Sequence, residues 1–174
     1  MEDIIIKKVN IDEIDQLQNI GRQTFYETFS TSNTQENMQD YLESGFSADK
    51  LLAELNDTNA EFYFAKVANH IIGYLKLNFG ASQTELKSEN GLEIERIYVL
   101  PEFHGKKVGQ TLYNKAIEIA NSKNAQFVWL GVWEENIRAI SFYKKNGFVA
   151  FDKHIFKLGE EEQTDIMMRL NLNN

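Results

Sequence analysis

The sequence predicts an α/β protein built on a mixed β-sheet with helices on both faces. A strand–helix–strand run in the second half predicts a right-handed crossover between two parallel strands. Two earlier strand patterns flank the turn Asn69-His70 and predict an antiparallel hairpin. The length of 174 residues, with one proline and no Pro/Gly/Ser-rich linker or repeat, favours a single domain over residues 1–174.

Apolar spacing divides the first half of the chain into strands and helices. Leu17, Ile20 and Thr24 recur near the helical period, whereas Phe62 and Phe64 alternate as strand residues do. The expected elements are a strand at Ile4–Val9, helices at Asp12–Ser30, Asn33–Gly45 and Ala48–Leu55, strands at Glu61–Ala68 and Ile71–Phe79, and a polar loop at Gly80–Asn90.

The second half shows clearer boundaries. Asn136 suits the N-cap of a helix, and Gly147 suits the left-handed residue that ends one. Val108, Leu112 and Ala116 form the apolar stripe of an amphipathic helix. The expected elements are strands at Leu92–Val99 and Gln126–Trp133, helices at Lys107–Lys123 and from Asn136, and closing strands at Phe148–Leu158 and Thr164–Leu170, which makes about seven strands in all.

Composition excludes several kinds of chemistry and partner. The chain has no cysteine, which excludes disulfides, thiolate metal sites and a cysteine nucleophile. We expect no metal site, because the three histidines are scattered. Without a signal peptide or a run of about 20 apolar residues, we expect a cytoplasmic protein with no membrane partner. A net charge of -8 disfavours nucleic acids and would attract cations, although solubility alone also explains it.

The loop before the third major helix has features of an anion site. Gly105 and Gly109 let the backbone approach a ligand, and free N–H groups at a helix start favour negative charge. His104, Lys106 and Lys107 add potential cations. The spacing matches neither a Walker loop nor G-x-G-x-x-G, and an ordinary solvated loop would also fit.

Two motifs in order give the chain a family resemblance. IYVLPEFHGKKVGQTLYNKA and VWLGVWEENIRAISFYKKNGF resemble the GNAT superfamily of acetyl-CoA-dependent N-acetyltransferases. LEIERIYV, TFYETF, ENMQDYLES and GEEEQTDIMM are similar to its PaiA-type spermidine/spermine acetyltransferases. There are two departures, since His104 stands where the superfamily usually has Gln or Arg, and Lys107 stands where it usually has Gly.

The resemblance implies a GNAT fold whose fourth and fifth strands splay apart around acetyl-CoA. It implies that the backbone of Ile97 to Val99 pairs with the pantetheine arm, while the following loop holds the pyrophosphate. Asn136 would contact the pantetheine unless it only caps its helix, and Lys145 would reach a phosphate unless it is only solvated. The candidate cofactor-binding residues are Ile97, Tyr98, Val99, His104, Gly105, Lys106, Lys107, Val108, Gly109, Gln110, Thr111, Asn136 and Lys145.

Acetyl transfer to an amine makes two demands on the protein. The ammonium must lose a proton before attack, and the thiolate leaving group must gain one. The resemblance assigns the second role to Tyr143, whose ring could instead only pack. Glu93 and Glu95 lie on one strand face, where proximity would raise one pKa and suit a base. A base acting through water, or two solvated carboxylates, stays open, and the N–H of Val99 is the expected oxyanion donor.

The acceptor side is predicted from the first helices and one strand end. Its candidate residues are Tyr26, Glu27, Phe29, Tyr41 and Trp133, each of which core packing would also explain. The resemblance and the charge favour a small-molecule amine, in particular a polyamine such as spermidine or spermine. Alternatives are a protein N-terminus or another small amine, and, in a different class, an acetyl-CoA-sensing module without turnover. A homodimer is possible.

Overall fold

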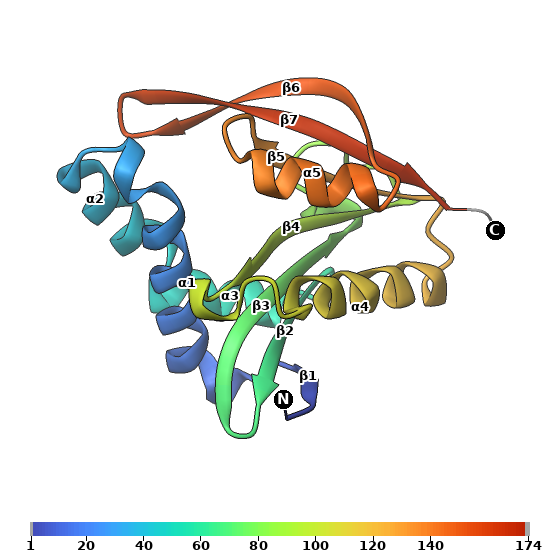
Figure 1. Ribbon diagram of the computed structural model, residues 1–174, viewed down its shortest axis with the longest axis horizontal. Helices are drawn as coiled ribbons and strands as arrows, with labels where there is room; N and C mark the ends of the chain where they lie inside the picture. Colours follow the sequence, from blue (N-terminus) through green and yellow to red (C-terminus); the bar gives the residue numbers. More distant parts are fainter. Residues whose placement is uncertain (1, 173–174) are drawn as a thin grey trace.

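Seven strands form one continuous sheet in the order β1-β2-β3-β4-β5-β7-β6 in the computed structural model, which describes residues 2–172 (Figure 1). Only β4 and β5 pair in parallel, and every other neighbouring pair is antiparallel. The predicted fold class is therefore confirmed. The strands are β1 (Ile4–Lys8), β2 (Ala60–Val67), β3 (His70–Phe79), β4 (Gly91–Val99), β5 (Phe127–Trp133), β6 (Val149–Leu158) and β7 (Glu161–Asn171).

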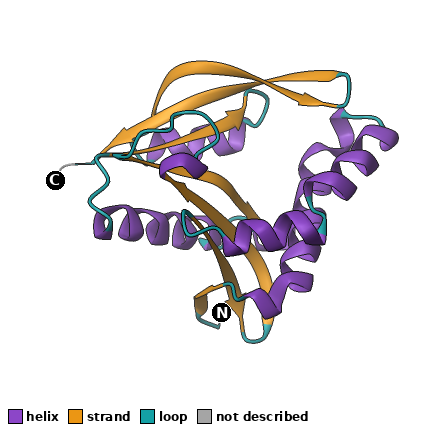
Figure 2. Ribbon diagram, turned by 180° about the vertical axis from the view of Figure 1, so that it is seen from behind, coloured by secondary structure: helices purple, strands orange, loops and turns teal. Residues whose placement is uncertain are grey.

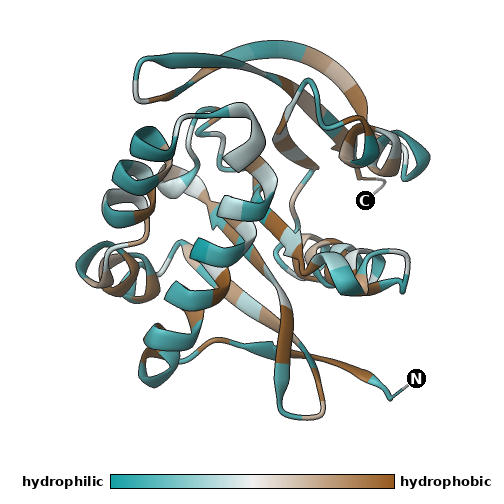
Figure 3. Cartoon of the chain, turned by 60° about the vertical axis from the view of Figure 1, so that its left-hand side comes forward, coloured by the Kyte–Doolittle hydropathy of each residue, from teal (hydrophilic) through white to brown (hydrophobic). Residues whose placement is uncertain are grey.

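Five α-helices cover the two faces of this sheet (Figures 1 and 2). Leu112 and Ala116 of one helix and Ile140 of another join the largest hydrophobic cluster against β2–β5. Leu17 and Leu51 pack on the opposite face against β2 and β3. Figure 3 shows brown, hydrophobic stretches along the strands and teal, hydrophilic stretches over much of the outer helical surface. The helices are α1 (Ile14–Phe29), α2 (Gln35–Gly45), α3 (Ala48–Asn56), α4 (Val108–Ser122) and α5 (Ile137–Lys145), with short 3₁₀ turns at Ile11–Glu13, Ser30–Ser32, Gly80–Ser82 and Pro101–Phe103.

Local chemistry explains where the observed ends differ from the predicted ones. The Thr34 and Ser47 side chains accept N–H bonds that start α2 and α3, as N-caps do. Lys107 lies outside α4 because its φ of +66° is left-handed and cannot belong to a right-handed helix. The acidic segment after Gly159, predicted as a turn, instead begins β7, because Gly159 at φ +64° makes a tight hairpin.

The strands β4 and β5 part soon after they meet. They pair only from Gly91 to Glu93, opposite Phe127 to Trp129, although each continues for several more residues. On the other side of β4, Arg96 lies opposite Lys76 but Ile94 lies opposite Leu77, which leaves Glu95 as the extra residue of a β-bulge. A bulge bends its strand and increases the local twist. The predicted splay between the fourth and fifth strands is thus present, and it exposes the edge of β4 to the space beside β5.

Candidate active site

Two adjoining cavities lie where β4 and β5 diverge. The loop-side cavity, about 640 Å³, extends along Val99 to the loop at Gly105 and Lys107. The hairpin-side cavity, about 370 Å³, lies between α1, α2, β4 and the β6–β7 hairpin, with Glu93 and Asp165 in its walls. The two form one passage because they share walls, namely Thr28, Ile97, Tyr98, Trp133, Asn136, Ala139 and Tyr143.

The loop-side cavity gathers nearly all of the candidate cofactor residues. All of them line it except Lys106 and Thr111. The Lys106 ammonium lies 5.2 Å from the centre of the Phe103 ring, and the Thr111 hydroxyl donates to the Lys107 carbonyl at 2.9 Å. These two side chains are engaged locally, and the N–H groups of the two residues also donate within the chain, to the Phe103 and Lys107 carbonyls.

The backbone at the start of α4 suits an anion. Gly105 and Lys107 both have positive φ, at +77° and +66°, which turns successive N–H groups in one direction. Within residues 2–172 the N–H groups from Lys107 to Gln110 have no hydrogen-bond acceptor. A Cβ built on Gly105 would meet nothing within 4 Å, so the loop is open to a ligand there. These donors at a helix N-terminus fit a pyrophosphate.

Lys107→Gly separates the backbone role of this position from its charge. Glycine adopts a left-handed conformation without the cost that lysine bears, so the free energy of unfolding should rise by up to about 1 kcal/mol. Loss of the cation should weaken CoA binding about 2- to 5-fold at low ionic strength and less at high salt. Thermal unfolding and titration calorimetry at two salt concentrations measure both effects. A drop in stability would contradict the strain argument.

Both ring nitrogens of His104 contact neighbouring groups. Its Nε2 donates to the Val99 carbonyl at 2.8 Å, and its Nδ1 contacts the Arg138 guanidinium. A positive charge at this point comes from Arg138 of α5, which sequence reasoning missed because its partner lies 34 positions away. Arg138 also lines the loop-side cavity.

The structure places the predicted acceptor residues in different cavities. Phe29, Tyr41 and Trp133 line the hairpin-side cavity, where the rings of Phe29 and Trp133 lie 5.5 Å apart. Glu27 lines the loop-side cavity instead. Tyr26 lines neither and is 51% exposed, because one step along a helix turns it about 100° from its inward-facing neighbour Phe25.

Glu93 and Glu95 share a face, as predicted, and share a partner. The Asn78 Nδ2 donates to Glu93 at 2.9 Å and to Glu95 at 3.2 Å. Glu93 also accepts from the Thr84 N–H at 2.8 Å and the Thr84 hydroxyl at 2.5 Å. Glu95 forms an ion pair with Lys76. Both carboxylates are therefore held by protein donors.

The pKa values of these two carboxyls move in opposite directions. Burial raises the pKa of Glu93, and the hydrogen bonds from Asn78 and Thr84 reduce this rise only in part. Burial also acts to raise the pKa of Glu95, but Arg96 and Lys76 outweigh it and the net pKa is lowered. The expected split thus exists, but its main cause at Glu93 is burial rather than repulsion between the two carboxylates.

Three further ionisable residues of the hairpin-side cavity were missed in the sequence. Glu85 and His154 form an ion pair, and Asp165 lies opposite His154 across β6 and β7. Burial is the largest influence on Asp165 and raises its pKa to about 6, with His154 opposing the rise and Glu85 adding to it. In the sequence, Asp165 is a single carboxylate just before the apolar residues of β7. The local pattern gives no reason to place it near β4.

Asp165→Asn should increase stability above about pH 4, with the largest gain at neutral and higher pH. The folded pKa of about 6 lies above the ordinary 3.8, so ionisation costs the folded state more than the unfolded chain. That cost is absent below about pH 4, grows through about pH 6 and is complete near pH 8. After allowance for solvent screening, the gain near pH 8 should be roughly 1 kcal/mol, or about 2–4 °C in Tm. Melting curves across this range test it, and equal gains at both ends would contradict it.

Tyr143 of α5 reaches the junction of the two cavities. Its ring is buried and packs edge-on against Phe142 and Phe148, at 5.4 and 5.6 Å between ring centres. Burial, followed by the nearby Tyr113, raises the pKa of Tyr143, so the phenol stays protonated at neutral pH. Its hydroxyl has no hydrogen-bond partner among the described residues. The neutral phenol is thus a proton donor with a free O–H at this junction.

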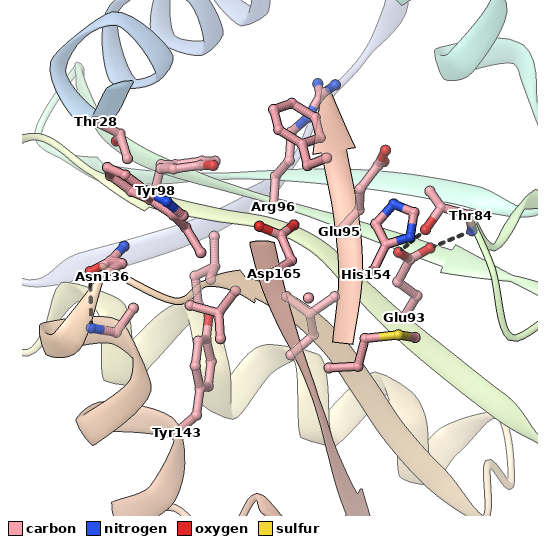
Figure 4. Close-up of a pocket in the computed structure, with 18 of the residues that line it drawn as sticks. Thr28, Thr84, Glu93, Glu95, Arg96, Tyr98, Asn136, Tyr143, His154 and Asp165 are labelled. Atoms are coloured by element: carbon pink, nitrogen blue, oxygen red, sulfur yellow. Dashed lines mark hydrogen bonds between the residues drawn. The ribbon is translucent and has the colours of Figure 1, made fainter. Parts of the chain in front are cut away.

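Asn136 has the capping role and also lies at the passage. Its Oδ1 accepts from the Ala139 N–H at 3.2 Å, which fixes the start of α5, and the residue lines both cavities. Figure 4 shows Asn136 and Tyr143 on the same side of the hairpin-side cavity. The cap therefore sets the position from which Tyr143 projects, two turns further along α5.

Residues 2–172 contain no group of three or more His, Asp or Glu side chains placed to hold a metal ion. None of their helices has the length and apolar character needed to cross a membrane.

Comparison with known proteins identifies the family. Residues 14–148 match the family model described as the acetyltransferase (GNAT) family. The chain belongs to this family. It is an N-acetyltransferase of the acyltransferase class, and acetyl-CoA is its co-substrate. The resemblance that the two motifs indicated is confirmed.

Individual relatives cover almost the whole GNAT chain. An uncharacterized N-acetyltransferase of Lactobacillus delbrueckii subsp. lactis is 37% identical over 97% of this chain and 98% of its own length. A spermidine N(1)-acetyltransferase of Thermoplasma acidophilum is 29% identical over 86% of this chain and 90% of its own. A crystal structure of a PaiA N-acetyltransferase from Thermoplasma acidophilum in complex with coenzyme A has a TM-score of 0.81 and 27% identity, covering 98% of this chain and 99% of that one.

Proposed function

We propose that this GNAT enzyme acetylates a polyamine, with spermidine as the representative acceptor. The observation that carries the proposal is the hairpin-side cavity, which joins the loop-side cavity and contains four carboxylates. The cations beside them are Lys76 and Arg96, both next to Glu95. The carboxylates are those of Glu85, Glu93, Glu95 and Asp165.

The apolar walls of this cavity support the same substrate class. The rings of Phe25 and Tyr41 stack 4.3 Å apart, and Phe156 lies 5.9 Å from Tyr41. Aromatic faces attract ammonium groups and cover alkyl segments. A chain that alternates ammonium groups with methylenes matches a cavity of this composition. One relative is named a spermidine N(1)-acetyltransferase, which supports the same substrate class.

The protein groups then have separate roles in the transfer. Acetyl-CoA supplies the acetyl thioester. The free N–H groups at the start of α4, with Lys107, hold its pyrophosphate, and the unpaired edge of β4 from Ile97 to Val99 holds its pantetheine arm. The Val99 N–H polarises the thioester carbonyl. The Tyr143 hydroxyl delivers a proton to the leaving sulfur.

A panel of acceptors tests the proposal. The purified protein is incubated with acetyl-CoA and spermidine, spermine, a neutral-tailed monoamine, amino acids or an N-terminal peptide, and free thiol is measured. We expect kcat/KM for spermidine and spermine to exceed that for the monoamine by at least about 10-fold, because each additional charge-assisted contact contributes about 1.5–3 kcal/mol.

The same panel decides between the alternatives. A preference for the peptide or for amino acids would replace the polyamine by another amine acceptor. An absence of thiol release with every amine would favour a module that only senses acetyl-CoA. The possible homodimer stays a prediction, and light scattering of the purified protein measures it. The exposed apolar residues Val149, Phe151 and Ile155 of the edge strand β6 would lie in such an interface.

A further inference from the structure

Asp165 lies in the wall of the hairpin-side cavity, next to a residue that both cavities share. In the register of β5 and β7 it is directly opposite Trp133, which lines both cavities. Figure 4 shows its carboxylate projecting into the middle of the hairpin-side cavity, between Tyr143 on one side and Glu93 and Glu95 on the other. A carboxylate at this place is close to where the acceptor nitrogen must meet the thioester.

The carboxylate of Asp165 differs from the other carboxylates of the cavity because it has no hydrogen-bond or ion-pair partner among the described residues. Glu93 accepts three hydrogen bonds, Glu95 is paired with Lys76, and Glu85 is paired with His154. Asp165 has neither a hydrogen bond nor an ion pair with any residue that the structure describes. Its lone pairs are the ones available to a ligand.

The strand register separates Asp165 from the two glutamates along the cavity. Glu93 lies opposite Trp129, at the closed end where β4 and β5 still pair, whereas Asp165 lies opposite Trp133. Four residues of strand span about 13 Å. A chain with two ammonium groups can therefore place one against Asp165 and the other toward Glu93 and Glu95.

We propose that Asp165 is a catalytic residue that binds the attacking ammonium of the acceptor and takes its proton. The inference rests on the polyamine N-acetyltransferase function proposed above and names its base. Glu93 and Glu95, the carboxylates that the sequence indicated, then bind the distal ammonium group of the acceptor. Their hydrogen bonds and ion pair also stabilise the end of the cavity where β4 and β5 still pair.

The proton and electron balance of the step is simple. One N–H bond of the ammonium breaks and an O–H bond forms on Asp165. The nitrogen lone pair so released forms the C–N bond to the acetyl carbonyl carbon, the C–S bond breaks, and the nitrogen loses a second proton to solvent as the neutral amide forms. Sulfur takes the proton of the Tyr143 hydroxyl, which solvent restores, while Asp165 releases its proton to solvent. The products are an N-acetylamine and free CoA thiol.

The surroundings of Asp165 support a base that works near neutral pH. It faces His154 of β6, Glu85 of the loop before β4, and Tyr41 of α2, while Glu93, Glu95, Arg96 and Tyr143 line the same cavity. Its raised pKa, about 6, is closer to the operating pH than that of an ordinary carboxylate. His154 stays paired with Glu85 and leaves Asp165 to the ligand.

Steady-state kinetics of Asp165→Asn test this inference. Wild type and variant are assayed with acetyl-CoA and spermidine between about pH 5 and pH 9, with CoA binding measured by calorimetry. We expect kcat/KM for spermidine to fall at least about 10-fold, the acidic limb of the profile near pH 6 to disappear, and CoA affinity to stay within about 2-fold. Glu162→Gln, which removes an exposed carboxylate of the same strand, is the matched control and should change none of these.

The outcomes separate this inference from the function on which it rests. An active wild type whose pH profile and spermidine kcat/KM survive Asp165→Asn overturns the role of Asp165 and leaves the polyamine activity standing. A wild type that releases no thiol with any amine overturns both. A melting temperature at or above that of wild type near neutral pH shows that the variant is folded, so a kinetic loss reports on the site.

Discussion

Replacing Tyr143 by phenylalanine is expected to lower kcat for spermidine about 100-fold, while the affinity for CoA changes less than about 2-fold. General acid catalysis by a positioned side chain contributes 10²- to 10⁴-fold, and the lower end applies because water can also protonate a thiolate. The raised pKa of the buried Tyr143 keeps its phenol protonated over the working range. Rapid-mixing measurement of thiol release, with CoA titration by calorimetry, tests both expectations.

A loss of stability should not account for the lower kcat expected of Tyr143→Phe. The Tyr143 hydroxyl makes no hydrogen bond to residues 2–172, so phenylalanine leaves no partner unsatisfied. Tyr113→Phe is the matched control, because Tyr113 packs against the same Phe142 and Phe148 rings, at 5.8 and 6.1 Å, but lines neither cavity. Equal kcat values for the two variants would reduce Tyr143 to a packing residue.

Features that depend on local pattern were predictable from the sequence. The cap at Asn136 and the termination near Gly147 need only neighbouring residues, and both are present in the structure. The parallel pairing of β4 and β5 follows from a strand–helix–strand order that allows few topologies. The order of the two motifs also led to the family.

Features that depend on distant pairs were not predictable in this way. Asp165 and Trp133 are neighbours only because β7 inserts beside β5, a register that no local signal in the chain indicates. The bulge at Glu95 depends on how β3 fits β4, and the contact of His104 with Arg138 depends on how the loop before α4 lies beside α5. Such pairs decide which carboxylate has no partner and which cation lies beside the anion loop, so the chemistry of the site needed the structure.

Gly73→Ala is expected to cause the largest loss of stability among the substitutions considered. A Cβ at this position would lie 2.6 Å from the backbone carbonyl oxygen of Tyr98 and 3.4 Å from the Cα of Val99. Because the obstructing atoms are backbone, relief requires β3 and β4 to move apart. Overpacking of this kind costs about 1–3 kcal/mol, which for a chain of this length corresponds to a Tm lowered by roughly 2–12 °C. Thermal and urea unfolding measure the loss.

The position of this glycine connects stability with cofactor binding. Gly73 lies opposite Val99 in the register, and Tyr98 and Val99 line the loop-side cavity, so displacing β4 should also raise KM for acetyl-CoA. Gly131→Ala is the matched strand control, because its Cβ would meet only the Asp165 side chain at an ordinary 3.5 Å and alanine reduces backbone freedom in the unfolded chain. The two substitutions should therefore change stability in opposite directions or by clearly different amounts. If Gly73→Ala left both Tm and KM unchanged, the approach of β3 to β4 would not set the position of the edge that holds the pantetheine arm.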